Sequence, residues 1–225
     1  MIARKKSIAV ISAHADDETL GCGGTILKHS ANGDVINWLI ATSPQTPKYT
    51  DSSVRERKDT IKAVAKSYGM NATYELGNQP ASLHESCLPD LIGKISKILN
   101  EIQPEIIYVV YPGDVHSDHK ITFDAVWACT KSFRLPCVKQ ILCFETLSST
   151  NVSPPLLTNC FIPNSYCDIT DLIDKKIEIL SLYKSEIMDD PHPRSFKKVR
   201  AISEYRGADI SVKNAEAFMI LKAIF

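Results

Sequence analysis

The sequence predicts an α/β fold in which helices flank a mainly parallel β-sheet, with a C-terminal extension. Short apolar runs alternate with segments of helical periodicity, which is the pattern of successive βα units. Two of these apolar runs end in clusters of histidine and aspartate, as expected where parallel strands end at a ligand site. The 225 residues, 44% of them hydrophobic, can form one core, so we expect a single domain over residues 1–225.

The N-terminal half supplies two strands and two helices. Residues 7–12 and 35–41 are apolar runs typical of buried parallel strands. A helix is expected at residues 25–31, between a glycine-rich turn and Asn32-Gly33. The next helix begins at Ser53, which forms a possible capping box with Glu56, and it ends before Gly69.

The middle of the chain continues the alternation. The expected strands are residues 72–76, 106–111 and 140–145, and the expected helices are residues 89–102 and 119–133. Apolar residues at helical spacing define the inner face of residues 89–102, and Pro104 separates this helix from the next strand.

Beyond Ser148 the pattern changes, and this region is the expected extension. A polar stretch with Pro154-Pro155 leads to a short strand near Cys160 and Phe161. A long amphipathic helix is expected at residues 169–183, followed by an irregular proline-rich loop at residues 189–195.

Charge and cysteine content exclude several classes of protein. The 26 basic and 26 acidic residues cancel, so we expect no nucleic-acid partner. No apolar run reaches the roughly 20 residues of a transmembrane helix, and the apolar stretch after the lysine-rich start is too short for a signal peptide. The seven scattered cysteines form no CxxC pair, which favours reduced thiols and a cytoplasmic location: Cys22, Cys87, Cys129, Cys137, Cys143, Cys160 and Cys167.

The two polar clusters predict a metal site. His14, Asp17 and His119 form a two-histidine, one-carboxylate set that suits a catalytic zinc ion with one position left for water. Such clusters are costly to bury unless a cation or a chemical task uses them. A lone histidine after a strand is more often a simple polar residue, but two clusters at equivalent strand ends favour a metal site.

The neighbouring residues suggest hydrolytic roles. Asp16 cannot easily share the metal with Asp17, and is better placed as the general base that takes a proton from water. His116 would stabilise the oxyanion as an imidazolium and protonate the leaving amine, with Asp118 holding its ring.

A dinucleotide site and simple helix capping are the competing interpretations. The segment LGCGGT lacks the GxGxxG pattern, so its glycines are interpreted as close-packing positions. Asp17 and Glu18 also suit the first turn of a helix, where the helix dipole favours acids.

The motifs AHADDE with GCGGT, and HSDH about a hundred residues later, resemble the PIG-L/LmbE-like family of zinc-dependent N-deacetylases. The resemblance implies a Rossmann-like fold and removal of an acetyl or similar acyl group from an amino sugar or its conjugate. It also implies that His14, Asp17 and His119 bind zinc, or another divalent metal such as Fe2+, with Asp16 as base and His116 as oxyanion partner. Ala15 replaces the proline usual in the family, and Asn78-Gln79-Pro80 lacks an acidic residue found in many members.

The substrate is less closely defined. Arg55, Glu145, His192 and Arg194 are the candidates for its binding rim, since arginines bind phosphate or carboxylate and Glu145 can accept sugar hydroxyls. We expect a small N-acylated amino sugar, nucleotide- or lipid-linked, and a possible homo-oligomer. The alternatives are a hydrolase of another small amide, and a sugar- or nucleotide-binding module without catalysis.

Overall fold

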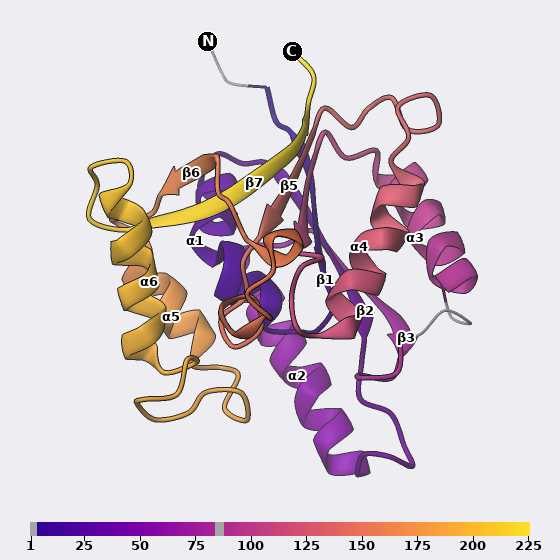
Figure 1. Cartoon of the computed structure of the whole chain (residues 1–225). Helices are drawn as coiled ribbons and strands as arrows, with labels where there is room; N and C mark the ends of the chain where they lie inside the picture. The colour runs from indigo at the N-terminus through magenta and orange to yellow at the C-terminus, as the bar shows by residue number, and fades with distance from the viewer. Residues whose placement is uncertain (1–3, 84–87) are drawn as a thin grey trace.

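The computed structural model describes residues 4–83 and 88–225, and its strands form one mixed sheet. The strand order is β3-β2-β1-β4-β5-β7-β6, and β7 is antiparallel to both of its neighbours, while the other pairs are parallel. The strands are β1 (Ser7–Ser12), β2 (Val35–Thr42), β3 (Ala72–Asn78), β4 (Ile106–Val110), β5 (Gln140–Phe144), β6 (Ser165–Asp168) and β7 (Ala215–Ala223). The predicted α/β class with a mainly parallel sheet is therefore confirmed (Figure 1).

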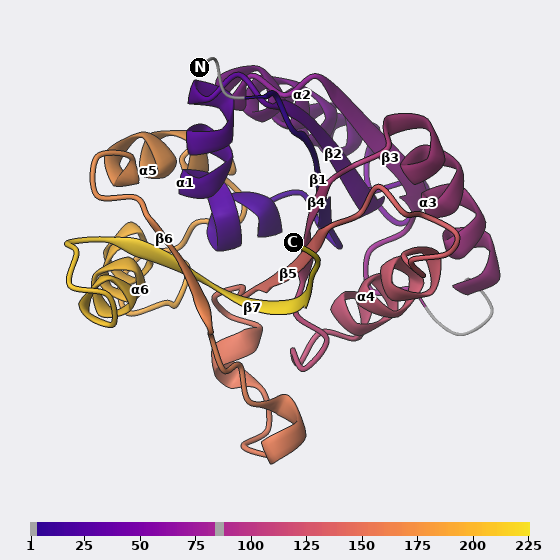
Figure 2. The ribbon, with the colours of Figure 1, turned by 90° about the horizontal axis from the view of Figure 1, so that it is seen from above.

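Helices cover both faces of this sheet. Seen from above, α3 and α4 lie on one face, and α1 and α5 lie on the other (Figure 2). The helices are α1 (Asp17–Ala31), α2 (Asp51–Tyr68), α3 (Leu88–Ile102), α4 (Ser117–Cys129), α5 (Ile173–Leu180) and α6 (Phe196–Ala208). Because both faces are covered, all five residues of β4 are buried, which explains its uninterrupted apolar sequence.

The first helix begins eight residues earlier than predicted. It starts at Asp17 and is kinked at Cys22, whose φ of −140° and ψ of 21° are not helical. The kink frees the backbone amides of Gly24 and Thr25, and the buried carboxylate of Glu216 accepts hydrogen bonds from both. The glycine-rich segment is thus part of a helix, and the partner that permits this comes from β7, at the other end of the chain.

Two other helix ends differ from the prediction. The cap of α2 is Thr50, whose hydroxyl accepts from the Ser53 amide, so the helix begins before the expected capping box. The fourth helix starts at Ser117 and ends at Cys129, four residues short of the predicted end.

The C-terminal extension is the least well predicted region. The strand expected near Cys160 is wrong, since β6 lies at Ser165–Asp168 and is defined by its pairing with β7. The helix expected at residues 169–183 is α5, shortened to Ile173–Leu180. The sequence did not predict α6 or β7, whereas the irregular segment 189–195 is confirmed.

Within the described ranges, six cysteines are free thiols, as expected, and Cys87 lies outside the described residues. No helix in those ranges is long and apolar enough to cross a bilayer.

Candidate metal centre and active site

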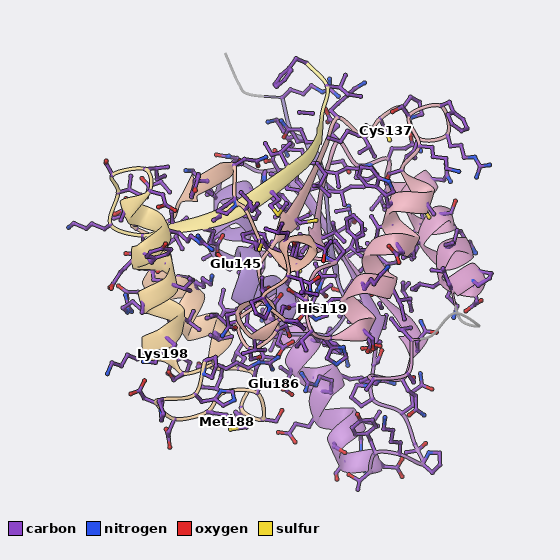
Figure 3. All side chains as sticks on the ribbon, viewed as in Figure 1. His119, Cys137, Glu145, Glu186, Met188 and Lys198 are labelled. Atoms are coloured by element: carbon purple, nitrogen blue, oxygen red, sulfur yellow. The ribbon has the colours of Figure 1, made fainter. Side chains whose placement is uncertain are left out.

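The two polar clusters meet because β1 and β4 are adjacent parallel strands. Ile11 of β1 pairs with Val109 of β4, so the chain leaves both strands at the same edge of the sheet. His14 and Asp17 follow β1, and His119 lies in the first turn of α4, near the centre of the molecule (Figure 3).

His14, Asp17 and His119 converge as the sequence predicted. Asp17 Oδ2 lies 3.6 Å from His14 Nδ1, and Asp17 Oδ1 lies 3.4 Å from His119 Nε2. One ligand atom from each residue fits within 4.8 Å of the others. Asp17 Oδ1 is buried and has no hydrogen-bond partner among the described residues, as expected of an atom that holds a cation. The donor set therefore fits a divalent metal such as zinc.

Electrostatics inside the cluster favour the same conclusion. Burial would lower the pKa of His14 and His119, but the neighbouring carboxylates raise these pKa values to about 9 and about 10. Burial likewise opposes ionisation of Asp17, yet the two imidazoles hold its pKa well below the usual value. The Asp17 carboxylate is thus stabilised by positive charge. Without a metal, the protonated imidazoles of His14 and His119 supply that charge, and a divalent cation would supply it when it displaces their protons.

Each candidate ligand histidine is oriented by a second carboxylate. His119 Nδ1 lies 2.6 Å from Asp114 Oδ2, and His14 Nε2 lies 3.0 Å from Asp118 Oδ2. Since an ionised carboxylate only accepts, these nitrogens carry a hydrogen, and in the neutral rings that a metal ion requires the opposite nitrogens, which face Asp17, would carry the free lone pairs. Asp114 was not among the residues predicted from the sequence, although an acid five residues before His119 is a recognisable signal.

Asp118 therefore has a different partner from the one predicted. Its Oδ2 is 3.9 Å from His116 Nδ1, beyond hydrogen-bond range, and contacts His14 instead. The backbone amides of Ala81 and Leu83 donate to its two oxygens and fix the carboxylate. His116 Nδ1 accepts from the backbone amide of Asp118, so this ring is oriented by main chain.

Asp16 and Asp17 point in different directions, as expected for neighbours. Asp16 Oδ2 accepts a hydrogen bond of 2.7 Å from Arg194, while its buried Oδ1 has no partner among the described residues. Burial raises the pKa of Asp16 to about 6, although Arg194 opposes the shift. Its φ of 155° is rare for a residue with a side chain, a strain that often marks functional positions. Glu18 faces the interior, where Thr19 and Tyr183 donate to it.

A cavity of about 350 Å3 opens onto this cluster. His14, Asp16 and His116 are among its lining residues, and the His14 and His116 ring centroids are 4.4 Å apart. The remaining walls are Ala15, Thr42, Pro44, Tyr49, Arg57, Ile61, Pro80, Ala81, Ser149, Glu186 and Arg194. The volume is that of a small-molecule site.

Of the four predicted rim residues, only Arg194 lines this cavity. Arg55 is exposed and donates to the Asp51 carbonyl one turn back on α2. Glu145 is bound by Arg206 through two hydrogen bonds of 2.7 and 2.8 Å, away from the cavity. His192 is exposed and accepts from the amide of Arg194.

Arg57 and Glu186 form a charged pair in the cavity wall that was not predicted from the sequence. Arg57 lies two residues beyond Arg55 on α2, and donates to Glu186 and to the Ala15 carbonyl. Glu186 follows α5 and also accepts from Arg194, 3.1 Å away (Figure 3). Two residues apart on a helix, Arg55 and Arg57 point in different directions. Only the packing of α2 against the rest of the protein decides which of them faces the cavity.

Comparison with known proteins places these features in a family. The family described as GlcNAc-PI de-N-acetylase (PIG-L) matches residues 9–130. The probable N-acetyl-α-D-glucosaminyl L-malate deacetylase 2 of Bacillus cereus is 22% identical over 84% of this chain and 89% of its own.

Solved structures show the same fold. The N,N'-diacetylchitobiose deacetylase of Pyrococcus horikoshii matches with a TM-score of 0.78 at 22% identity, over 96% of this chain and 84% of its own. The 4-carboxy-2-hydroxymuconate hydratase of Pseudomonas putida matches with a TM-score of 0.72 at 18% identity, over 98% of both chains. The fold thus serves more than one reaction, and activity must be argued from the site.

Proposed function

Since the chain belongs to the GlcNAc-PI de-N-acetylase (PIG-L) family, we propose that it is a metal-dependent hydrolase that removes an acetyl or similar acyl group from an N-acylated amino sugar or sugar conjugate. The observation that carries this proposal is the buried Asp17 Oδ1, which accepts no hydrogen bond from the described residues and lies between two oriented imidazoles, next to the buried carboxylate of Asp16. The names of its relatives, which include a malate-linked glucosamine and diacetylchitobiose, support a sugar amide as substrate.

His14, Asp17 and His119 would hold the metal, which we propose to be zinc, with Fe2+ as the alternative. When bound, such a metal supplies Lewis-acid activation of water and of the acyl carbonyl. The nitrogen-rich, three-residue set supports this choice, because catalytic zinc sites use three protein ligands and leave a position open.

Asp16 acts as the general base. Its Oδ1, which has no hydrogen bond within residues 4–83 and 88–225, can accept the proton of the attacking water, while the bond from Arg194 to Oδ2 holds the carboxylate in place. The same proton can then pass to the nitrogen of the leaving amine.

His116 acts as the oxyanion partner. Because its Nδ1 accepts the Asp118 amide, the hydrogen of a neutral ring lies on Nε2, which can donate to the developing oxyanion in the cavity. A neutral His116 cannot act as the imidazolium acid that the sequence suggested. The protonation of the leaving amine is therefore assigned to Asp16.

The test is a screen of N-acetylated sugars and nucleotide sugars for release of free amine. We expect turnover that a chelator abolishes and zinc restores. The variant Asp16→Asn should retain the metal by elemental analysis and lose about 10²-fold or more in kcat. Stoichiometric zinc without hydrolysis of any N-acyl sugar would favour the non-catalytic binding module, and hydrolysis of unrelated small amides would favour the broader amidase.

We expect the enzyme to act in the cytoplasm on a small nucleotide- or lipid-linked sugar. Fractionation of the native host and size-exclusion chromatography would test the location and the possible homo-oligomer.

A further inference from the structure

A group of basic side chains lies at the edge of the sheet opposite the metal cluster. Lys139 directly precedes β5, and Lys222 of β7 pairs with Ile141 near the start of β5. The metal cluster follows the other ends of the parallel strands β1 and β4, so the two features lie at opposite edges of one sheet. Figure 3 shows the loop of Cys137 at the top of the view and His119 near its centre.

Contacts join Lys222 to the loop that follows α4. Its ammonium group donates to the Thr130 carbonyl, 3.3 Å away and directly before Lys131. Arg134 lies in the turn that begins at Lys131, because its amide donates to the Lys131 carbonyl. Between these two cations stands Phe133, which is 81% exposed. The loop therefore presents an apolar ring flanked by positive charge.

The positive charge of this edge is poorly compensated. Among residues 4–83 and 88–225, no carboxylate forms an ion pair with Lys131, Arg134, Lys139 or Lys222, whereas Arg4 pairs with Glu105, whose carbonyl accepts from the Lys139 amide. Burial and then the charge of Lys139 lower the pKa of Lys222, as expected for adjacent ammonium groups. The basic face is defined as Arg4, Lys131, Phe133, Arg134, Lys139 and Lys222.

The basic face gives the neutral chain an electrostatic direction. The 26 basic and 26 acidic residues cancel, so an excess of cations at one edge is balanced by carboxylates elsewhere. Those of the metal cluster lie at the opposite edge: Asp16, Asp17, Asp114 and Asp118. A negatively charged surface would attract the basic face and leave the metal cluster turned away.

The aromatic residues of this edge favour a lipid bilayer as that surface. An anionic bilayer has charged headgroups at its surface and apolar groups directly beneath, which Lys131, Arg134 and the exposed Phe133 match. Trp127, 45% exposed in the last turn of α4, adds a second interfacial ring. Single-stranded nucleic acid stacks its bases on open ring faces, but here Arg134 lies over the Phe133 ring and Phe123 stacks on Trp127.

We propose that the basic face binds the surface of an anionic phospholipid bilayer, with the Phe133 ring in the headgroup region. The bilayer is a docking surface and not a substrate, since the metal-facing cavity lies at the opposite edge of the sheet. The inference is independent of the proposed function, because a protein without hydrolytic activity would bind in the same way.

Cosedimentation of the full chain with vesicles tests the proposal. The probes are vesicles of phosphatidylcholine and vesicles in which about a third of the lipid is phosphatidylserine. We expect the anionic vesicles to bind about tenfold more tightly or better in about 0.1 M salt, and about 0.5 M salt to abolish the preference. Equal binding to both kinds of vesicle, or binding to neither, would overturn the proposal.

Charge reversals locate the binding surface. Lys131→Glu/Arg134→Glu should lower the affinity for anionic vesicles about tenfold or more. Lys58→Glu/Lys62→Glu makes the same change of net charge at exposed positions of α2, and should retain most of the affinity. Lys139→Glu repeats the test outside the loop, in case the first variant does not fold. Equal weakening by the α2 variant and by the variants of the basic face would show that net charge alone causes binding, against the proposal.

The aromatic ring and the competing partner are tested separately. Phe133→Ser, at an exposed position, should lower the affinity about threefold or more without changing the salt dependence, and an unchanged affinity would overturn insertion of the ring. A labelled single-stranded oligonucleotide of about 20 nucleotides is the competing probe. If it bound more tightly than the anionic vesicles, and Lys131→Glu/Arg134→Glu abolished that binding, the partner would be nucleic acid and the bilayer proposal would be wrong.

Discussion

His119 Nδ1 and Asp114 Oδ2 are 2.6 Å apart, with both side chains buried at the end of β4. The contact holds the ring so that Nε2 faces Asp17, and Asp114 would thereby orient a ligand of the proposed metal without being a ligand itself. His14 and Asp118 repeat this arrangement on the other side of the cluster.

We expect Asp114→Asn to weaken zinc affinity about 10- to 100-fold, because the amide is a weaker acceptor and can orient the ring in the wrong tautomer. Competition with a chromophoric chelator measures the Kd directly. Asp124→Asn, a change at a half-exposed position of α4 whose side chain pairs with Lys120, is the control. An unaltered zinc Kd in Asp114→Asn would remove Asp114 from the support of the metal.

Arg194 is expected to position Asp16. Arg194→Ala should lower kcat about 10²-fold with the metal retained, since the carboxylate loses the partner that aims it. Arg55→Ala should leave both kcat and KM unchanged, because its side chain is exposed, lies outside the cavity lining and donates its hydrogen bond to its own helix. A rise in KM alone for Arg194→Ala would instead support the substrate-binding role expected from the sequence.

The buried Lys176–Glu216 ion pair should be essential for stability. Lys176 Nζ donates to Glu216 and to the Leu20 carbonyl beside the kink of α1. Lys176→Met leaves a buried carboxylate without its cation and should lower the free energy of unfolding by about 3–5 kcal/mol, measured with urea. The double variant Lys176→Met/Glu216→Gln should recover part of that loss, because the remaining side chain is no longer charged. If the losses in unfolding free energy of the two single variants simply added in the double variant, the two side chains would not be directly coupled.

Gly21 should not tolerate a side chain. A Cβ there would lie 2.1 Å from Phe144 Cδ2 and 2.8 Å from the Glu145 carbonyl oxygen, so we expect Gly21→Ala to destabilise the protein by about 1–3 kcal/mol. Gly93 lies within α3, where a Cβ would meet no atom of the described residues within 4 Å, and Gly93→Ala should stabilise by about 0.5–1 kcal/mol. Thermal and urea unfolding compare the two variants, and equal effects would refute the packing argument.

The sequence by itself determined the five parallel strands, because buried strands leave continuous apolar runs. It also indicated the candidate metal set, because two clusters of histidine and aspartate follow two such strands. Residues 14, 17 and 119 could be assigned to one site from the sequence, because the carboxyl ends of adjacent parallel strands lie at the same edge of the sheet.

Tertiary structure alone decided the rest. The helical state of the glycine-rich segment depends on Glu216, about 190 residues away, and the position of β6 depends on pairing with β7. Packing between distant elements also decides that Arg57, and not Arg55, lines the cavity. It likewise decides that Asp118 contacts His14 and not His116. Local propensity and spacing encode which residues are near one another along the chain, but the hydrogen-bond partners of buried polar groups are fixed only when the elements pack.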